Sequence, residues 1–87
     1  AFGASFESLT PAEKRNLGIN NGVRVLKVNS GKFRTKGIKE GFIIIEINNH
    51  AVNKPEDIKS IVDASEEGIY IEGIYPDGSI AYYAIEL

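Results

Sequence analysis

Turn and helix-breaking residues interrupt this chain at short intervals, so every regular element between them is short. Asparagine and glycine tolerate the left-handed backbone that tight turns need, and proline fixes φ at a turn or at a helix start. The segments between the breaks read in turn as strands and short helices, which indicates an α+β domain. The breaks fall at Gly18, Asn20-Asn21-Gly22, Ser30-Gly31, Gly37, Glu40-Gly41, Asn48-Asn49, Gly68 and Pro76-Asp77-Gly78-Ser79.

The strand segments are recognised by alternation or by β-branched and apolar content. In the first strand, Phe2, Ala4 and Phe6 lie on one side. The third is nearly continuous apolar, which suits a strand buried on both faces. The last two form a hairpin, and Gly73 marks a bulge or a close backbone approach. The predicted strands are Phe2–Leu9, Val23–Val28, Phe42–Ile47, a short strand after Asn49, Ile69–Tyr75 and Ile80–Leu87.

Two helix starts have the spacing of a capping box. Thr10-Pro11-Ala12-Glu13 predicts a short helix through Asn16, and Asn53-Lys54-Pro55-Glu56 predicts a longer one that Gly68 closes. Lys32–Lys36 could form one helical turn that stops at Gly37. We therefore expect a small, strongly bent, mostly antiparallel sheet or partial barrel. One main helix and one or two short helices would cap it.

The main helix has two apolar faces. Ile58 and Ile61 are three residues apart and should both point into the core, so Ile61→Ala should cost about 2–5 kcal/mol of stability. Pro55, Lys59 and Val62 follow the i, i+4, i+7 pattern and share a neighbouring face.

Composition excludes several classes of function. The chain has 87 residues, enough for a single domain over 1–87 that looks like a piece of a longer protein. The net charge of −2 without a basic stripe gives no reason to expect nucleic acid. The absence of cysteine removes disulfides and thiolate chemistry. The longest uncharged apolar stretch, Phe42–Ile45, is too short for membrane insertion.

The sequence offers no catalytic or cofactor site. His50 is the single histidine, and no activated-serine motif accompanies it, so an exposed turn residue is the simpler interpretation. One histidine with scattered carboxylates gives no metal-ligand spacing, and no glycine-rich phosphate motif occurs. We expect a non-catalytic domain with no cofactor and no metal.

Gly3 points to a different kind of site. A glycine at the entry of a strand lets successive backbone amides converge, and such amides can hold a carboxylate. A groove between the strand after Gly3 and the helix from Lys54 to Ala64 would supply a strand edge and an apolar floor. Those are the two requirements for adding a peptide as an extra strand.

Four segments of the chain carry motifs that are weak alone but specific in combination: Ala1-Phe2-Gly3-Ala4, Asn20–Gly31, Lys36–Ile44 and Glu46–Val52. In order and spacing, these motifs resemble the PDZ domains of bacterial HtrA/Do-type periplasmic serine proteases, most closely the last PDZ domain of such a protease. In that family the four segments correspond to the carboxylate-binding loop, G-V-x-V-x-x-V-x-x-G-S, A-G-L-x-x-G-D-V-I and x-I-N-G-x-x-V, and the resemblance covers essentially the whole chain.

The resemblance implies a module that captures hydrophobic C-terminal or unfolded peptide segments by β-strand addition. It would serve substrate recognition or regulation of a serine endopeptidase in periplasmic protein quality control. The other expected partners are the protease domain and further PDZ domains of the parent chain. Val62 would form the floor of the pocket for the ligand's last side chain, with Lys59 along the rim. The implied peptide-binding residues are Phe2, Gly3, Ala4, Ser5, Phe6, Pro55, Lys59 and Val62.

Two alternatives stay open. The groove could be unused, in a structural or oligomerisation domain of the same protease, and Phe2 and Phe6 would then serve only core packing. An independent enzyme is the third hypothesis. The sequence also departs from the family at Phe42, where an acidic residue is usual, and at Asn49, where glycine is usual. The residue that precedes the carboxylate loop in the family, often basic, is not part of this sequence.

Overall fold

The computed structural model describes residues 2–87, which form six strands and three helices. Ala1, with which the predicted carboxylate loop begins, lies outside the described residues. The elements are β1 (Ala4–Ser8), α1 (Pro11–Leu17), β2 (Val23–Val28), α2 (Lys32–Thr35), β3 (Ile43–Ile47), β4 (His50–Ala51), α3 (Pro55–Ala64), β5 (Gly68–Ile74) and β6 (Ile80–Glu86).

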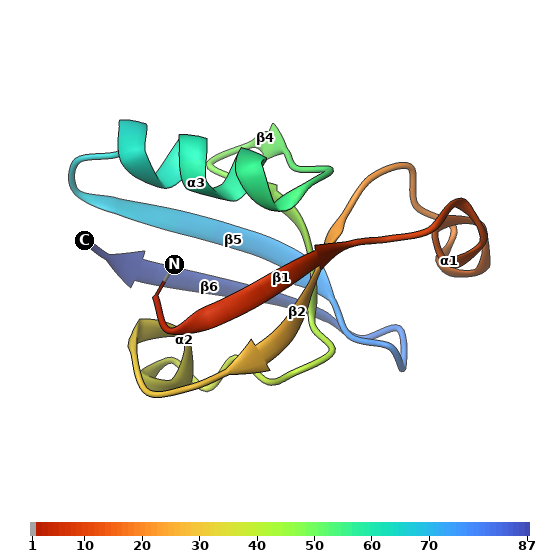
Figure 1. The fold of residues 1–87 in the computed structure, drawn as a ribbon, viewed down its shortest axis with the longest axis horizontal. Coiled ribbons are helices and arrows are strands. Elements are labelled where there is room, and N and C mark those ends of the chain that lie inside the picture. The colour runs from red at the N-terminus through yellow and green to blue at the C-terminus, as the bar shows by residue number, and fades with distance from the viewer. Residues whose placement is uncertain (1) are drawn as a thin grey trace.

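All strands belong to one sheet in the order β1-β2-β3-β5-β6, with β4 paired to β3, and every pairing is antiparallel. The sheet is strongly bent, so that β1 and β2 lie in front of β5 and β6, and α3 lies above (Figure 1). The main helix and the two short ones are those expected, and the predicted α+β architecture is confirmed.

The core lies inside this bend and is wholly apolar. Phe42 is fully buried, and its ring contacts those of Tyr75 and Tyr83 at centroid distances of 4.7 and 5.3 Å. Gly73 makes this possible, since a Cβ there would stand 2.4 Å from Cζ of Phe42 and 2.2 Å from the carbonyl oxygen of Ile43. The predicted close approach at Gly73 is confirmed. It also gives a packing reason for the unusual phenylalanine at position 42.

The start of α1 is the capping box read from the sequence. The Thr10 hydroxyl accepts from the Glu13 amide at 3.2 Å, and the Glu13 carboxylate accepts from the Thr10 amide at 2.9 Å. That backbone hydrogen bond, together with Arg24, lowers the pKa of Glu13. Arg24 also contacts Glu7 at 2.7 Å, so α1 is connected to β1 and β2. The helix ends one residue later than predicted, at Leu17, before left-handed Gly18.

The predicted start of α3 is wrong by one residue. Lys54, and not Asn53, is the N-cap, so the third helical residue is Asp57 and not Glu56. The Asp57 carboxylate accepts from the amides of Asn53 and Lys54, at 2.8 and 3.1 Å. The Asn53 side chain instead accepts from the ammonium of Lys14 at 2.9 Å. The helix ends at Ala64, and Gly68 begins β5 instead of closing the helix.

Candidate functional site

A strand edge and a helix face meet along one side of the molecule. Strand β1 is at the end of the sheet, where β2 is its strand partner, and α3 contacts it from the other side. The two elements run in opposite directions, so the end of α3 and the start of β1 lie on the same side of the molecule, at the left of the view (Figure 1). An edge strand presents backbone groups that a further strand can pair with. The structure therefore contains both elements of the predicted groove, the edge strand β1 and the helix α3.

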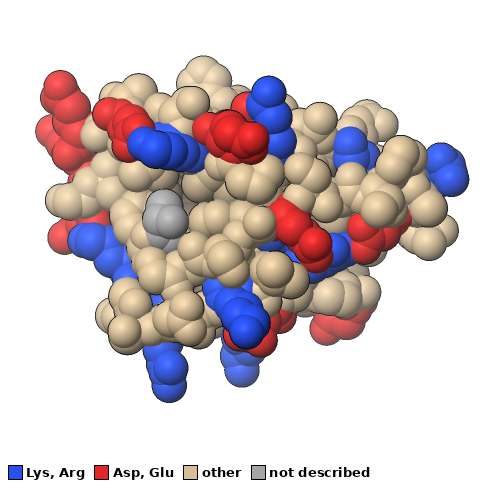
Figure 2. All heavy atoms as spheres, in the orientation of Figure 1, with Lys and Arg blue, Asp and Glu red and all other residues tan. Residues whose placement is uncertain are grey.

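The space between these two elements is a hollow of about 440 Å³, which we call the front hollow. It brings together Phe6 of β1 with Pro55, Lys59 and Val62 of α3. Four of the eight predicted binding residues therefore line one hollow, although 49 positions separate Phe6 from Pro55. Figure 2 shows this side of the molecule, with charged side chains gathered along α3 and uncharged surface below them. The hollow is mostly apolar, as a pocket for an aliphatic or aromatic side chain requires.

The faces of α3 are only partly as predicted. Ile58 is 1% exposed and belongs to the core. Ile61 is half-buried, packs against the core from outside, and lines a second hollow on the other side of the helix. A three-residue step turns the helix by about 300°, which leaves the two side chains about 60° apart around its axis. A core contact narrower than that angle accommodates only one of the two side chains fully. The expectation that both isoleucines point into the core is therefore wrong for Ile61.

The other four predicted residues lie at the start of β1. Phe2 and Gly3 both have positive φ, at 56° and 76°. Gly3 is required there, because a Cβ would stand 2.2 Å from the carbonyl oxygen of Ser30. Its own carbonyl accepts from the Asn29 amide at 2.7 Å. The loop is thus fastened to the turn after β2, and its backbone direction is fixed before any ligand arrives.

Phe2 and Phe6 have a packing role as well as a position beside the groove. Both rings lie 5.7 Å from the ring of buried Phe33, the first stacked and the second edge-on. Ala4 is half-buried and Ser5 is exposed. A register shift between Ser5 and Phe6 interrupts the pairing with β2. This bulge, which sequence alternation did not reveal, turns β1 relative to its partner.

Three further residues line the front hollow and were missed by sequence reasoning: Glu56, Ile58 and Asp63. Asp63 could have been found, since it lies four residues after Lys59 and forms an ion pair with it at 2.6 Å. The Lys59 side chain is 76% exposed, as predicted for a rim residue. Its ammonium is nevertheless already paired.

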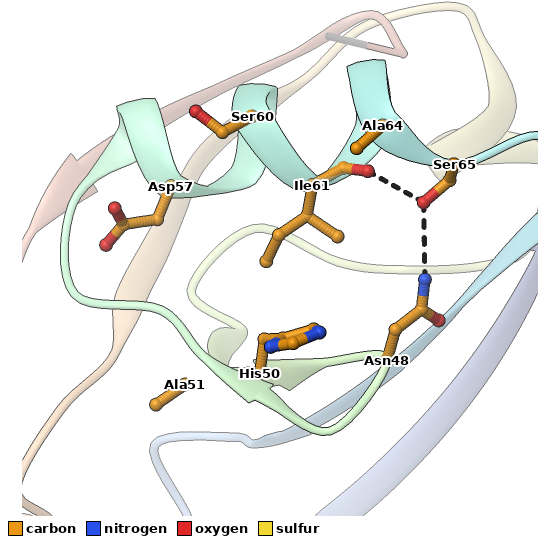
Figure 3. Close-up of a pocket in the computed structure, with 8 residues that line it drawn as sticks. All are labelled: Asn48, His50, Ala51, Asp57, Ser60, Ile61, Ala64 and Ser65. Carbon is orange, nitrogen blue, oxygen red and sulfur yellow. Dashed lines mark hydrogen bonds between the residues drawn. The ribbon is translucent and has the colours of Figure 1, made fainter.

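The second hollow lies behind α3 and measures about 520 Å³ (Figure 3). We call it the rear hollow. Ile61 points from the helix toward the imidazole of His50, while the Ser60 hydroxyl points away from it (Figure 3). The Asn48 amide donates to the Ser65 hydroxyl at 3.3 Å, and that hydroxyl donates to the carbonyl of Ile61 at 2.7 Å. The lining is therefore more polar than that of the front hollow.

The rear hollow brings His50, Asp57 and Ser60 close together in space but not into a catalytic arrangement. No hydrogen bond joins the three side chains, and the Asp57 carboxylate serves the amides that begin α3. A serine nucleophile needs a histidine within hydrogen-bond reach and an acid that orients it. His50 is exposed, as expected of a turn residue.

The described part of the chain, residues 2–87, contains no group of three or more potential metal ligands. It also contains no helix long and apolar enough to cross a membrane.

Two comparisons with known proteins agree with this geometry. The structure matches the PDZ domain of HtrA3, crystallised with the phage-derived ligand FGRWV, at a TM-score of 0.76 over 100% of this chain and 81% of that chain. The sequence identity of that pair is 17%. In sequence, an alignment 71 residues long, which covers 79% of this chain, is 34% identical to a probable periplasmic serine endoprotease, DegP-like, of Halomonas elongata. No protein-family model matches the sequence.

The chain therefore has the PDZ fold. The resemblance to the HtrA type that its motifs predicted is confirmed. The matched segment spans 15% of the length of the DegP-like relative, so the comparison covers one module of that enzyme.

Proposed function

We propose that this domain binds the C-terminal segment of a polypeptide as an additional strand along β1. The observation that carries the proposal is the apolar front hollow beside an edge strand. Strand addition draws affinity from main-chain hydrogen bonds at the edge and specificity from a pocket for alternate side chains. The class of ligand is a peptide that ends in an apolar residue with a free carboxylate.

The ligand would run antiparallel to β1, with its last residue toward the Phe2–Gly3 loop. Its terminal side chain would enter the front hollow over Val62 and against Phe6. Its carboxylate would accept from backbone amides near Phe2, Gly3 and Ala4. The fixed left-handed backbone at Phe2 and Gly3 supports this, because a preorganised loop does not have to be ordered on binding.

The comparisons support the same mode. HtrA3's PDZ domain, which has this fold, was crystallised with a short ligand that ends in valine. By extension from the DegP-like relative, the parent of this domain would be a periplasmic serine endopeptidase, in which the domain presents or senses polypeptide termini.

A second candidate function is a structural or assembly domain whose groove stays empty. One observation favours it: the rings of Phe2 and Phe6 both pack on Phe33, so these residues have a stabilising role without any ligand.

Titration of the ¹⁵N-labelled chain with a pentapeptide that ends in valine separates the two candidates. The peptide is used as the free acid and as the C-terminal amide. Strand addition predicts shifts that concentrate on residues 2–8 and 55–63. Amidation removes a charge-assisted interaction worth about 1.5–3 kcal/mol, which is roughly a tenfold to hundredfold loss of affinity.

The control is a peptide of the same composition with its apolar residue moved to the first position. Equal binding of acid and amide would show that the loop does not hold the carboxylate. Absence of shifts at millimolar peptide would favour the structural role instead.

A further inference from the structure

The outer face of β3, β5 and β6 exposes two large aromatic side chains. Tyr70 is 71% exposed and Tyr82 is 67% exposed. Neither hydroxyl has a hydrogen-bond partner within residues 2–87. Both rings border a hollow of about 410 Å³ that shares no lining residue with the front hollow. We call it the outer hollow.

Two glutamates lie directly opposite one another in this hollow. Glu46 of β3 is the register partner of Glu72 of β5, and Glu72 is in turn the partner of Tyr82 of β6. Two carboxylates and an aromatic ring therefore lie side by side across the three strands. Like charges directly opposite one another in antiparallel strands are destabilising. No Lys, Arg or His lines the hollow, and neither carboxylate has an ion-pair or hydrogen-bond partner among the described residues.

The backbone around this row is held firmly. Tyr70 donates its amide to the Asn48 side chain at 2.8 Å, and the Asn48 amide donates to the Tyr70 carbonyl at 2.9 Å. The β3–β4 turn, left-handed at Asn48 and Asn49, is thereby joined to β5. The repelling pair therefore stays in place, although nothing within the described chain neutralises it.

We propose that the outer hollow is a docking site for an arginine side chain presented by a partner polypeptide. A guanidinium is planar and carries several forked donors, so it can bridge two neighbouring carboxylates. Its faces stack on aromatic rings, which Tyr70 and Tyr82 supply. The charge complementarity is direct, because one cation relieves the repulsion between Glu46 and Glu72. The site is independent of the peptide groove proposed above and lies on a different face of the sheet.

The test uses the blocked tripeptide acetyl-Gly-Arg-Gly-amide, which has neither a free carboxylate nor an apolar last residue for the front hollow. When the ¹⁵N-labelled chain is titrated with this peptide at low salt, the changes in amide chemical shift should concentrate on residues 46–49, 70–72 and 82. The citrulline analogue keeps the shape and loses the charge, and it should bind at least about tenfold more weakly. Raising the ionic strength from about 0.02 M to 0.5 M should weaken the arginine peptide severalfold, because the site is open to solvent.

Glu72→Gln sharpens the test, because its effects on binding and on stability have opposite signs. It should reduce the affinity for the arginine peptide about tenfold while raising the thermal unfolding midpoint, since the like-charge pair is gone. Glu66→Gln, at an exposed glutamate outside the hollow, makes the same change of charge and should leave binding unchanged. Tyr82→Leu should weaken the arginine peptide more than its lysine counterpart, because a guanidinium stacks more broadly on a ring.

The proposal is overturned if citrulline and arginine peptides bind alike, or if Glu66→Gln weakens binding as much as Glu72→Gln. It is equally overturned if Glu72→Gln lowers the unfolding midpoint, because the two carboxylates would then not repel one another.

Discussion

Helix α3 has a hollow on each side, and the two are built from different kinds of surface. The front hollow, about 440 Å³, is mostly apolar and runs along the edge strand β1. The rear hollow, about 520 Å³, is lined by hydroxyl, amide, carboxylate and imidazole groups as well as by Ile61. Several of these polar groups already have hydrogen-bond partners within the chain.

The difference shows why volume alone does not identify a binding site. The rear hollow is larger, yet its Asn48, Asp57 and Ser65 groups hold the turn and both ends of the helix in place. A ligand there would have to displace bonds that stabilise the fold. The front hollow presents apolar surface and a strand edge, so a ligand adds contacts without breaking any.

The largest effect is expected under the helix, where Ile58 is buried in the core and also lines the front hollow. Ile58→Ala should lower the free energy of unfolding by about 2–5 kcal/mol, because a fully buried side chain leaves a cavity. Urea unfolding followed by circular dichroism measures the loss. A change below about 1 kcal/mol would mean that α3 does not bury Ile58 in the core.

Ile61→Ala should cost less, about 1–2 kcal/mol, because Ile61 is half-buried and its removal enlarges an open hollow instead of creating a cavity. This replaces the figure of about 2–5 kcal/mol expected from the sequence. The same unfolding experiment gives the value. Peptide affinity should stay within about twofold, and a large loss of binding would mean that the rear hollow takes part in recognition.

Enlarging Val62 tests the front hollow directly. Val62→Phe should shift preference for the ligand's last residue from large to small side chains by about tenfold, or about 1.4 kcal/mol, because the new ring fills the hollow. Competition between peptides that end in phenylalanine and in alanine measures the shift, and Ile61→Ala serves as the control on the opposite face. The two faces would have to be exchanged if Val62→Phe strongly destabilised the domain and the variant, measured at a lower temperature at which it is folded, kept the original preference.

The smallest effect is expected at the rim. Lys59→Ala should change the free energy of unfolding by no more than about 0.5 kcal/mol, since the Lys59–Asp63 pair is exposed. Preference for an acidic residue upstream in the ligand should fall by less than about fivefold, because Asp63 already competes for the ammonium. Lys36→Ala, at an exposed lysine away from the groove, is the matched control. An effect above 1 kcal/mol would indicate that Lys59 packs more closely than its exposure suggests.

Local chemistry explains what could be predicted. The Thr10–Glu13 cap, the left-handed turn at Asn48 and Asn49, and the stop at Gly37 each depend on residues adjacent in the chain. The shared helix face of Pro55, Lys59 and Val62 follows from helical geometry alone, and the structure places all three on the front hollow. The peptide-binding role of the eight predicted residues stays a prediction.

The sequence by itself determined the order of the elements and their approximate bounds, because turn chemistry and periodicity act over a few residues. The PDZ class came from the resemblance of its motifs to a known family. Tertiary structure decided the rest. Only the packing of α3 against the sheet decided that Ile58 is buried and Ile61 half-buried. Only the start of the helix, one residue later than predicted, made Asp57 the capping carboxylate. Only the register of three strands brought Glu46 and Glu72 into one row with Tyr82. These positions lie far apart along the chain, and strand pairing, which no local pattern encodes, is what makes them neighbours.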